Sequence, residues 1–157
     1  MPSQLSDSDI TVLLAELKPL PRDYQSRLQL RPKSGHKERE LDLTGAAGSD
    51  FQLIVRQSLF NPLDFSVILG YLMPGSNVLF RLRRYNGRSH QHTNRIEGNT
   101  FYDFHIHTAT ERYQAAGHDE DHYAETTDRF VDLGGAIQCM LQDCAFELPS
   151  DTQGSLF

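Results

Sequence analysis

Hydrophobic residues near the start of the chain recur with the period of an amphipathic helix. They fall on one helical face: Ile10, Leu13, Leu14 and Leu17. Ser6 and Asp7 supply N-cap chemistry before the first of them, and Pro19 ends the run because proline cannot continue a helix. We therefore predict a short N-terminal helix that packs its leucines inward.

From residue 28 onward, apolar positions largely alternate with polar ones, which is the pattern of β-strands. Around a turn at residues 32–35, this alternation predicts a charged hairpin with one apolar face, formed by Leu28, Leu30, Leu41 and Leu43. Residues 51–57 and 65–72 are the most apolar segments, so we predict central strands that are covered on both faces. Residues 78–85 follow as a further strand.

Two more helices are predicted in the second half of the chain. Thr108 to Glu111 fit a capping box, and the helix that they open would end at Ala116 with Gly117 as its C′ residue. Residues 118–128 lack periodicity and are predicted to be a polar loop. After Asp132, a helical stripe that is expected to lie on the sheet contains Leu133, Ile137, Met140, Leu141 and Cys144.

These elements predict an α+β fold: an antiparallel sheet of about six strands in a meander, with a short N-terminal helix and a C-terminal helix packed on it. The 157 residues fit a single domain over residues 1–149 and a flexible tail over residues 150–157. No apolar run approaches the roughly 20 residues that span a bilayer, so no membrane partner is expected. Cys139 and Cys144 would point about 140° apart on a helix. A disulfide between them is therefore not expected, and a cytoplasmic location fits best.

The net charge of −6 hides an uneven distribution along the chain. Residues 81–96 contain five arginines and no acid, whereas residues 118–147 contain eight acids and a single arginine. Two interpretations remain open. Either both segments are solvated faces that stabilise each other, or the arginines form a local patch that grips phosphates.

The candidate chemistry lies between residues 81 and 107. Asn86-Gly87 favours a type I′ turn, which would fold this segment into a β-hairpin. One face of that hairpin would collect Arg81, Arg83, Tyr85, Arg88, His90 and His92. In the strand that follows, the same alternation places Asp103, His105 and His107 on one face. If that strand pairs with the hairpin, two His-x-His pairs converge on one patch.

Metal binding is one use of such histidines. Imidazoles two residues apart on a strand can bind one zinc or nickel ion, and Asp103 could add an oxygen ligand. The expected placement of Arg81, Arg83 and Arg88 on the same face opposes this use, because their charges would repel a dication. We therefore expect no metal and no other cofactor.

Metal-free cleavage of RNA fits the mixture of histidine and arginine better, because the 2′-hydroxyl of RNA is an internal nucleophile. Histidine can donate or accept a proton near neutral pH, and arginine stabilises charge on phosphoryl oxygens. We predict His105 and His107 as acid and base, with His90 assisting. Other residues are predicted to hold phosphate or stack on a base: Arg81, Arg83, Arg84, Arg88, His92, Tyr85, Arg112 and Tyr113.

Two motifs in this region carry a resemblance. Arg84-Tyr85-Asn86-Gly87-Arg88-Ser89-His90 and Phe104-His105-Ile106-His107 resemble an uncharacterised bacterial family with a Phe-His-Ile-His-x-Ala-Thr-Glu-Arg-Tyr-Gln block. They are more distantly similar to TumE-type toxin components of toxin–antitoxin pairs. The similarity covers about residues 78–107, and the chain departs from the TumE-type pattern by having His90-Gln91-His92 in place of adjacent histidines.

The resemblance implies a small α+β toxin that acts on RNA and is encoded beside an antitoxin. By motif position, it carries over to Arg84, Asn86, His90, His105 and His107. The first hypothesis is therefore a metal-independent ribonuclease whose partners are RNA, or another phosphate-bearing ligand, and a cognate antitoxin. The alternative is a non-catalytic module that binds nucleic acid or protein, such as an inhibitor or accessory factor in phage–host conflict.

Overall fold

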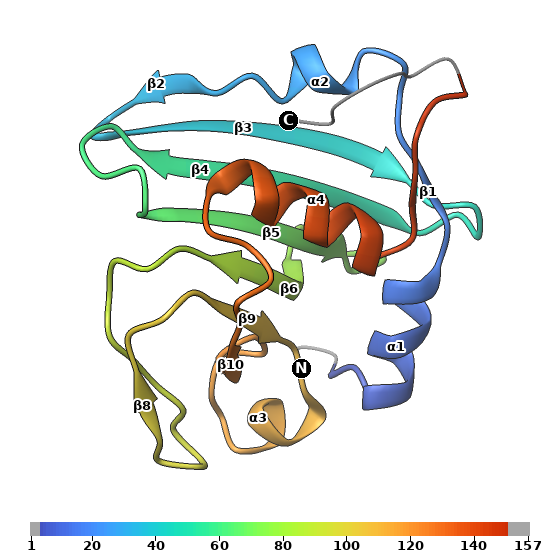
Figure 1. Ribbon diagram of the computed structural model, residues 1–157. Coiled ribbons are helices and arrows are strands. Elements are labelled where there is room, and N and C mark those ends of the chain that lie inside the picture. Colours follow the sequence, from blue (N-terminus) through green and yellow to red (C-terminus); the bar gives the residue numbers. More distant parts are fainter. Residues whose placement is uncertain (1–3, 151–157) are drawn as a thin grey trace.

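The computed structural model describes residues 4–150, which form an α+β fold around a seven-stranded antiparallel sheet (Figure 1). The strands in spatial order are β10 (Ala124–Thr126), β9 (His105–Thr108), β6 (Leu79–Asn86), β5 (Phe65–Leu72), β4 (Asp50–Ser58), β3 (His36–Thr44) and β2 (Arg31–Lys33). The predicted antiparallel meander is therefore confirmed from β2 to β6, and β9 and β10 continue the sheet.

Four helices and two small strand pairs complete the described chain. The helices are α1 (Asp7–Ala15), α2 (Tyr24–Arg27), α3 (Glu111–Ala115) and α4 (Leu133–Asp143). The strand pairs are β1 (Lys18–Pro19) with β11 (Phe146–Glu147), which is parallel, and β7 (His92–Thr93) with β8 (Thr100–Phe101), which is antiparallel. The predicted N-terminal and C-terminal helices are both present, whereas α2 and the strand pairs were not predicted.

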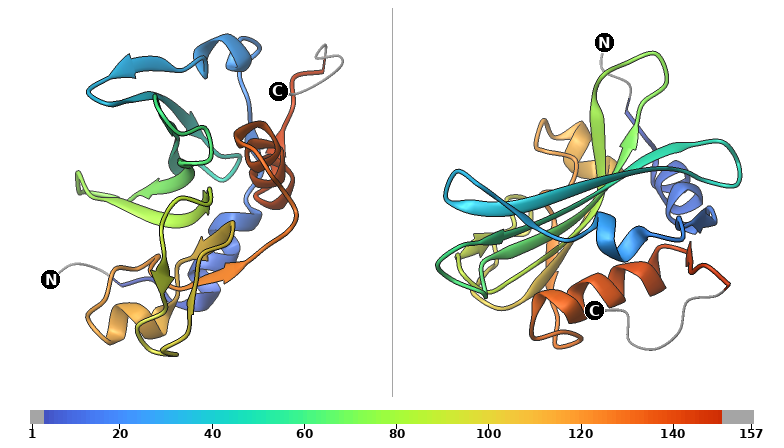
Figure 2. Two further views of the ribbon diagram at one scale, coloured as in Figure 1. Left: turned by 60° about the vertical axis from the view of Figure 1, so that its left-hand side comes forward. Right: turned by 90° about the horizontal axis from the view of Figure 1, so that it is seen from above.

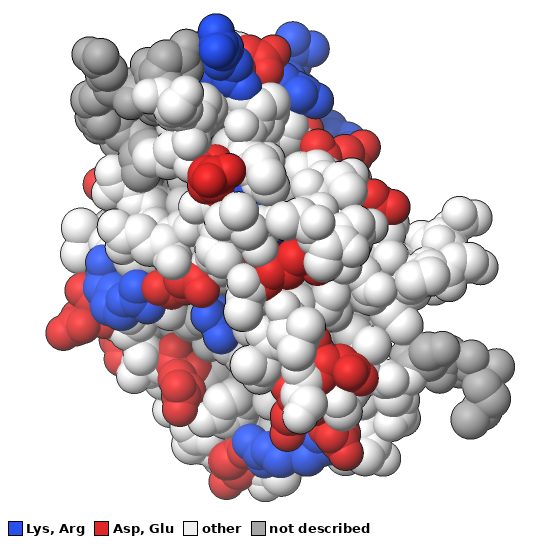
Figure 3. Space-filling view, turned by 90° about the vertical axis from the view of Figure 1, so that its right-hand side faces the viewer, with Lys and Arg blue, Asp and Glu red and all other residues white. Residues whose placement is uncertain are grey.

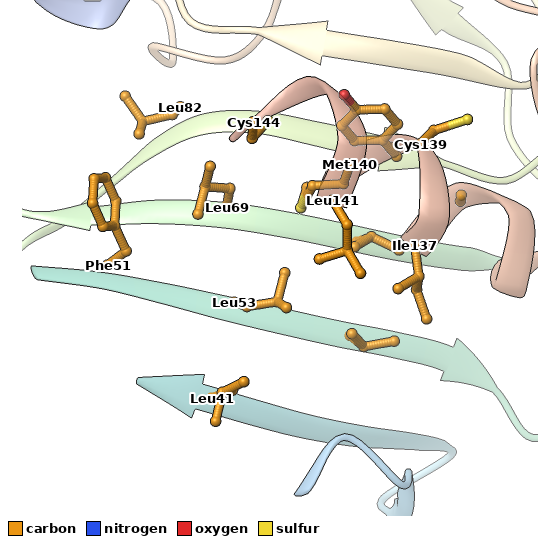
Figure 4. Close-up of a cluster of buried hydrophobic side chains, with 14 of the residues drawn as sticks. Leu41, Phe51, Leu53, Leu69, Leu82, Ile137, Cys139, Met140, Leu141 and Cys144 are labelled. Atoms are coloured by element: carbon orange, nitrogen blue, oxygen red, sulfur yellow. The ribbon is translucent and has the colours of Figure 1, made fainter. Parts of the chain in front are cut away.

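Helix α4 covers one face of the sheet and builds the main core there (Figure 2). Side chains from alternate strand positions meet the apolar stripe of the helix (Figure 4). The strands contribute Leu41, Leu53, Leu69 and Leu82, and the helix contributes Ile137, Met140 and Leu141. Asp132 caps this helix by accepting a hydrogen bond from the Gly135 amide at 2.8 Å.

The opposite face of the sheet is more open. On β4, Gln52 and Ile54 are half-buried and Arg56 is exposed, while their neighbours on the other face are fully buried. The prediction that the central strands are covered on both faces is therefore wrong for β4, whereas on β5 Ile68 and Gly70 of this face are buried. A single long helix packs on this sheet, so polar side chains can gather on the face that it leaves free.

The predicted N-terminal helix is present, but it ends at Ala15, and the prediction that Leu17 packs inward on it is wrong, because Leu17 lies beyond the helix and is 43% exposed. Ser6 caps it in a reciprocal capping box with Asp9, and Ile10, Leu13 and Leu14 are buried. After the helix, the ammonium of Lys18 is fully buried and donates to four backbone carbonyl groups at 2.7–3.0 Å, those of Leu13, Leu14, Glu16 and Cys144. This lysine joins the C-terminal ends of α1 and α4.

The predicted hairpin at Asn86-Gly87 is wrong. Strand β6 continues to Asn86 and pairs with β9, and neither residue of the dipeptide has the positive φ that a type I′ turn needs. Gly87 instead donates its amide proton to the Phe65 carbonyl at 2.9 Å, and a Cβ at this position would collide with the backbone carbonyl of Leu63. The chain therefore stays beside β5 and does not reverse.

Two local predictions around α3 need correction. The N-cap is Thr110, whose hydroxyl accepts from the Tyr113 amide at 3.2 Å, and not Thr108, which lies at the end of β9. Gly117 has the expected positive φ of +82° after the helix. The segment predicted as a polar loop contains β10, which pairs with β9.

The remaining expectations concern the cysteines, the membrane and the tail. Cys139 and Cys144 are both buried and unpaired, as predicted. Across residues 4–150 no helix combines the length and the apolar character needed to cross a bilayer. The tail predicted over residues 150–157 lies outside the described residues except for Ser150.

Candidate metal centre

Three histidine rings meet on the open face of the sheet. His105 and His107 project from β9 beside Asn86 and Arg84, their register partners on β6, and His92 comes from β7. The ring centroids lie 4.8 Å (His92–His107), 4.9 Å (His105–His107) and 5.5 Å (His92–His105) apart. One ring nitrogen from each histidine lies within 4.8 Å of the other two. Convergence of the histidines was predicted, although His92 arrives from a different hairpin.

Backbone carbonyl groups fix the tautomers of the two β9 histidines. Nδ1 of His105 lies 2.8 Å from the carbonyl oxygen of Asp103, and Nδ1 of His107 lies 2.8 Å from that of Asp121. A carbonyl oxygen can only accept, so each Nδ1 carries the proton. In the neutral rings, Nε2 then carries the lone pair.

A buried asparagine fixes the tautomer of His92 in the same way. The Ala124 amide donates to Oδ1 of Asn94 at 2.9 Å, and Nδ2 of Asn94 donates to the Ala124 carbonyl at 2.8 Å. The side-chain amide can therefore point only one way. Nε2 of His92 lies 3.0 Å from this Oδ1 and must be the protonated nitrogen, which leaves the lone pair on Nδ1.

Burial keeps these imidazoles neutral. His105 and His107 are 5% and 2% exposed, and their pKa values are lowered to about 4 and about 2. Burial is the largest cause, and the neighbouring Arg84 guanidinium and nearby imidazoles act in the same direction. Burial also lowers the pKa of His92. At neutral pH all three rings are therefore uncharged, and each has one unprotonated nitrogen.

Carboxylates neutralise the arginines beside the cluster. Asp121 is 1% exposed and lies between Arg84 Nε at 3.3 Å and Arg81 Nε at 3.5 Å. Glu120 and Asp119 add further ion pairs with Arg81. On the face shown in Figure 3, basic and acidic groups likewise lie next to one another. The arginine-rich and acid-rich segments therefore contact each other here, but Asp121 is buried and not part of a solvated face. The acids partly offset the arginine charge that opposes a dication.

A polar pocket of about 270 Å³ opens beside the three rings. Its wall includes Asn86, whose Oδ1 accepts from the Ser66 hydroxyl at 2.9 Å and whose Nδ2 lies 3.5 Å from His107 Nε2. His90 lies at the same pocket, but it is 80% exposed and 3.8 Å from Asp64. The third residue of the predicted catalytic set therefore lies near the cluster without joining it.

Several predicted substrate-binding residues lie elsewhere. Tyr85 is fully buried under α4 and donates to Asp143 at 2.5 Å, and Arg83 lies on that same face beside it. Tyr113 is fully buried and donates to Glu97, which also pairs with Arg112. Neither tyrosine can stack on a base, because its ring is covered.

The remaining arginines of the predicted substrate-binding set form ion pairs or lie at another pocket. Arg84 and Arg81 pair with the acids around Asp121, as described above, so their charges are partly offset. Arg88 lies at a separate pocket with Asp103 and Arg129. The arginine clamp expected from the sequence is not assembled at the histidines.

Sequence reasoning missed three residues that shape the site. Asn94 shares a strand face with His92 by simple alternation, and that spacing was the available signal. His122 was expected on the surface, but it is half-buried at the pocket with its ring centroid 5.0 Å from that of His92. Asp121 gave no periodic signal.

Three neutral imidazoles with converging lone pairs can bind a transition-metal ion, and the hydrogen bonds on their second nitrogens are those that orient metal ligands in proteins. Within the described chain, His92, His105 and His107 each offer a ring nitrogen within 4.8 Å of those of the other two, and are the candidates for such a group. Comparisons with protein-family models, with curated proteins and with solved structures give no match for this chain.

Proposed function

We propose that the protein binds one divalent transition-metal ion through His92, His105 and His107 and uses it for hydrolysis. The observation that carries the proposal is the fixed tautomer of all three rings. Each ring donates from one nitrogen to an oxygen held by the fold, and each of the three residues offers a ring nitrogen within 4.8 Å of those of the other two. Such an arrangement can hold a cation.

The number and type of ligands indicate the class of metal. Imidazole suits zinc, copper, nickel and iron, and three histidines with an open fourth position are typical of catalytic zinc sites. Zinc–nitrogen bonds of about 2.0–2.1 Å require ligand nitrogens closer together than 4.8 Å. Tetrahedral ligands at that bond length lie about 3.3 Å apart, so the rings must close by up to about 1.5 Å when the ion binds. His92 lies on a two-stranded hairpin outside the main sheet, which allows that adjustment.

The open position would face the polar pocket. A metal ion held by the three histidines would act there as a Lewis acid and would activate water for hydrolysis. Asn86 lines this pocket, with its Oδ1 held by Ser66 and its Nδ2 3.5 Å from Nε2 of His107, so its amide group could donate to an oxygen anion that develops during the reaction. This chemistry serves esters, amides and phosphodiesters.

Metal-independent RNA cleavage, which we expected from the sequence, stays a prediction. It needs one histidine to carry a proton near neutral pH. The lowered pKa values of His105 and His107 speak against this role for those two residues. The same neutral state favours metal binding, because protons do not compete for the lone pairs.

The binding test uses protein stripped with a chelator and then titrated with zinc. We expect one zinc per chain, with the affinity lowered at least about 100-fold in His105→Gln and in His107→Gln, since each loses a ligand. His118→Gln is the matched control, because His118 is exposed and outside the group. Absence of zinc binding, or equal binding by all three variants, would overturn the proposal.

The activity test uses p-nitrophenyl acetate, bis(p-nitrophenyl) phosphate and RNA with stripped and zinc-loaded protein. Under the proposal, hydrolysis of at least one probe appears with zinc and disappears with EDTA. RNA cleavage that continues in EDTA and is lost in His105→Ala would favour the metal-independent ribonuclease. A zinc-loaded protein that is inert toward all three probes would refute the hydrolytic part of the proposal.

A further inference from the structure

A second pocket of about 310 Å³ adjoins the histidine pocket and shares Asp64, Phe65 and Ser66 with it. It extends over the open face of the sheet to His36 and Arg56. We propose that the two pockets form one substrate groove, in which a phosphate or carboxylate group of the substrate binds at Arg56 while the reacting group lies at the histidines. The inference rests on the proposed metal-dependent function.

The register of the strands aligns the polar side chains that line the groove. His105 pairs with Asn86, Asn86 with Ser66, Ser66 with Arg56, and Arg56 with Glu38. Register partners on neighbouring strands project from the same face, so these side chains form a polar row across four strand boundaries. The next row along the strands contains Ile68 and Ile54 in its middle. The polar row is therefore confined to the edge on which the pockets open.

The far end of the row carries an excess of cations. Glu38 is shared by three basic side chains: Arg56 at 3.0 Å, His36 at 3.3 Å and Lys33 at 3.7 Å. One carboxylate cannot balance two permanent cations, and Arg56 is 49% exposed beside the pocket. Asp64, the acid in the shared wall, faces His90 at 3.8 Å. An incoming anion would therefore meet an arginine with unused donors, the side chain best suited to phosphate and carboxylate.

The distance between Arg56 and the histidines determines how long the substrate must be. Arg56 lies three strands from His105, which at about 4.8 Å per strand places the two ends of the groove about 14 Å apart. The substrate is therefore an extended molecule with its anionic group about 14 Å from the bond that is cleaved. Such a length excludes a small ester as the natural substrate and fits an oligomer or a long-chain acid.

The test uses zinc-loaded protein and hydroxamic acids, which bind zinc through the hydroxamate. The probes carry a linker that spans about 14 Å, matching three strand spacings, and end in phosphonate, carboxylate or methyl. Isothermal titration calorimetry gives the affinities. We expect at least one charged tail to bind about tenfold more tightly than the methyl tail, as a charge-assisted hydrogen bond provides. The preferred tail distinguishes a phosphate-bearing from a carboxylate-bearing substrate.

Two variants and a shorter probe complete the design. In Arg56→Gln the affinities of the three probes should agree to within about twofold. Arg95 is an exposed arginine outside both pockets, so Arg95→Gln should still bind the charged tail more tightly than the methyl tail. Probes with a linker of half that length should bind with the same affinity whichever tail they carry. Equal affinity of the three long probes for the wild-type protein would overturn the groove while leaving the metal centre intact. Failure of every hydroxamate to bind would count against the metal centre itself.

Discussion

Burial of His105 and His107 makes the stability of the metal-free protein sensitive to mild acid. Their pKa values are lowered from 6.5 to about 4 and about 2, chiefly by burial. Below pH 6.5 the unfolded chain therefore binds protons that the folded chain does not. Above about pH 6.5 both states are neutral, so the two histidines make their full contribution to the unfolding free energy. It is lost progressively as the pH falls towards about 4 for His105, and further for His107.

The magnitude follows from the distance between the working pH and the unfolded pKa. A pH of 5 lies about 1.5 units below the unfolded pKa, and each unit lowers the unfolding free energy by about 1.36 kcal/mol for each histidine. Each therefore removes about 2 kcal/mol, and the pair removes about 4 kcal/mol. Small domains are stable by only about 5–15 kcal/mol in total. The loss should therefore move the midpoint of denaturation strongly.

Urea unfolding in EDTA at pH 7.5 and at pH 5, followed by circular dichroism, measures this loss. In His105→Gln one titrating group is removed, so the fall in unfolding free energy between the two pH values should shrink by about 2 kcal/mol. The same change is expected for His107→Gln, whereas His118→Gln should behave as the wild type. An equal fall in all four proteins would refute the idea that these imidazoles are held neutral in the fold.

Three further substitutions test other parts of the structure. Lys18→Met leaves three buried carbonyl groups without this donor, at about 1–3 kcal/mol each, and should lower the unfolding free energy by about 3 kcal/mol or more in urea titrations; a loss below about 1 kcal/mol would contradict the role of the ammonium. Gly87→Ala forces a Cβ against the Leu63 carbonyl and should cost about 1–3 kcal/mol. Ser89→Ala should cost little, so equal thermal midpoints for these two variants would contradict the close approach. Asn94→Ala frees the His92 ring and should weaken zinc binding about 10–100-fold in chelator competition; unchanged affinity would show that Asn94 does not hold the ligand.

The local pattern was enough to predict most of the secondary structure. Periodicity gave α1, α4 and the strands β3 to β6, because each buries one stripe or face against the same core. The failure at Asn86-Gly87 has a tertiary cause. The glycine is needed where the chain passes the backbone of Leu63, and that contact outweighs the turn preference of the dipeptide. A dipeptide signal cannot reveal a neighbour more than twenty residues away in the chain.

The candidate site was predictable only in part. Alternation placed His105 and His107 on one face, since period two is a property of any strand. The groups that decide the chemistry come from tertiary structure: the carbonyl group of Asp121, the amide of Asn94 and the acids that neutralise Arg84. Without them, the arginines suggested a phosphate clamp. With them, the same arginines are structural partners of a buried carboxylate.

The buried ion pair and the three imidazoles beside it cost folding free energy, and this cost is itself an argument for function. Arg84 and Asp121 form an ion pair in which Nε and both carboxylate oxygens are buried without a well-aligned hydrogen bond. Such a pair at best balances its desolvation, and apolar residues of similar volume are often more stable. Beside it, three imidazoles with lowered pKa values face one another and make the fold sensitive to acid. Packing alone does not require either feature, and both meet at one pocket. A bound cation would use all three lone pairs at once, and the carboxylate of Asp121 already offsets the arginine charge that would oppose it.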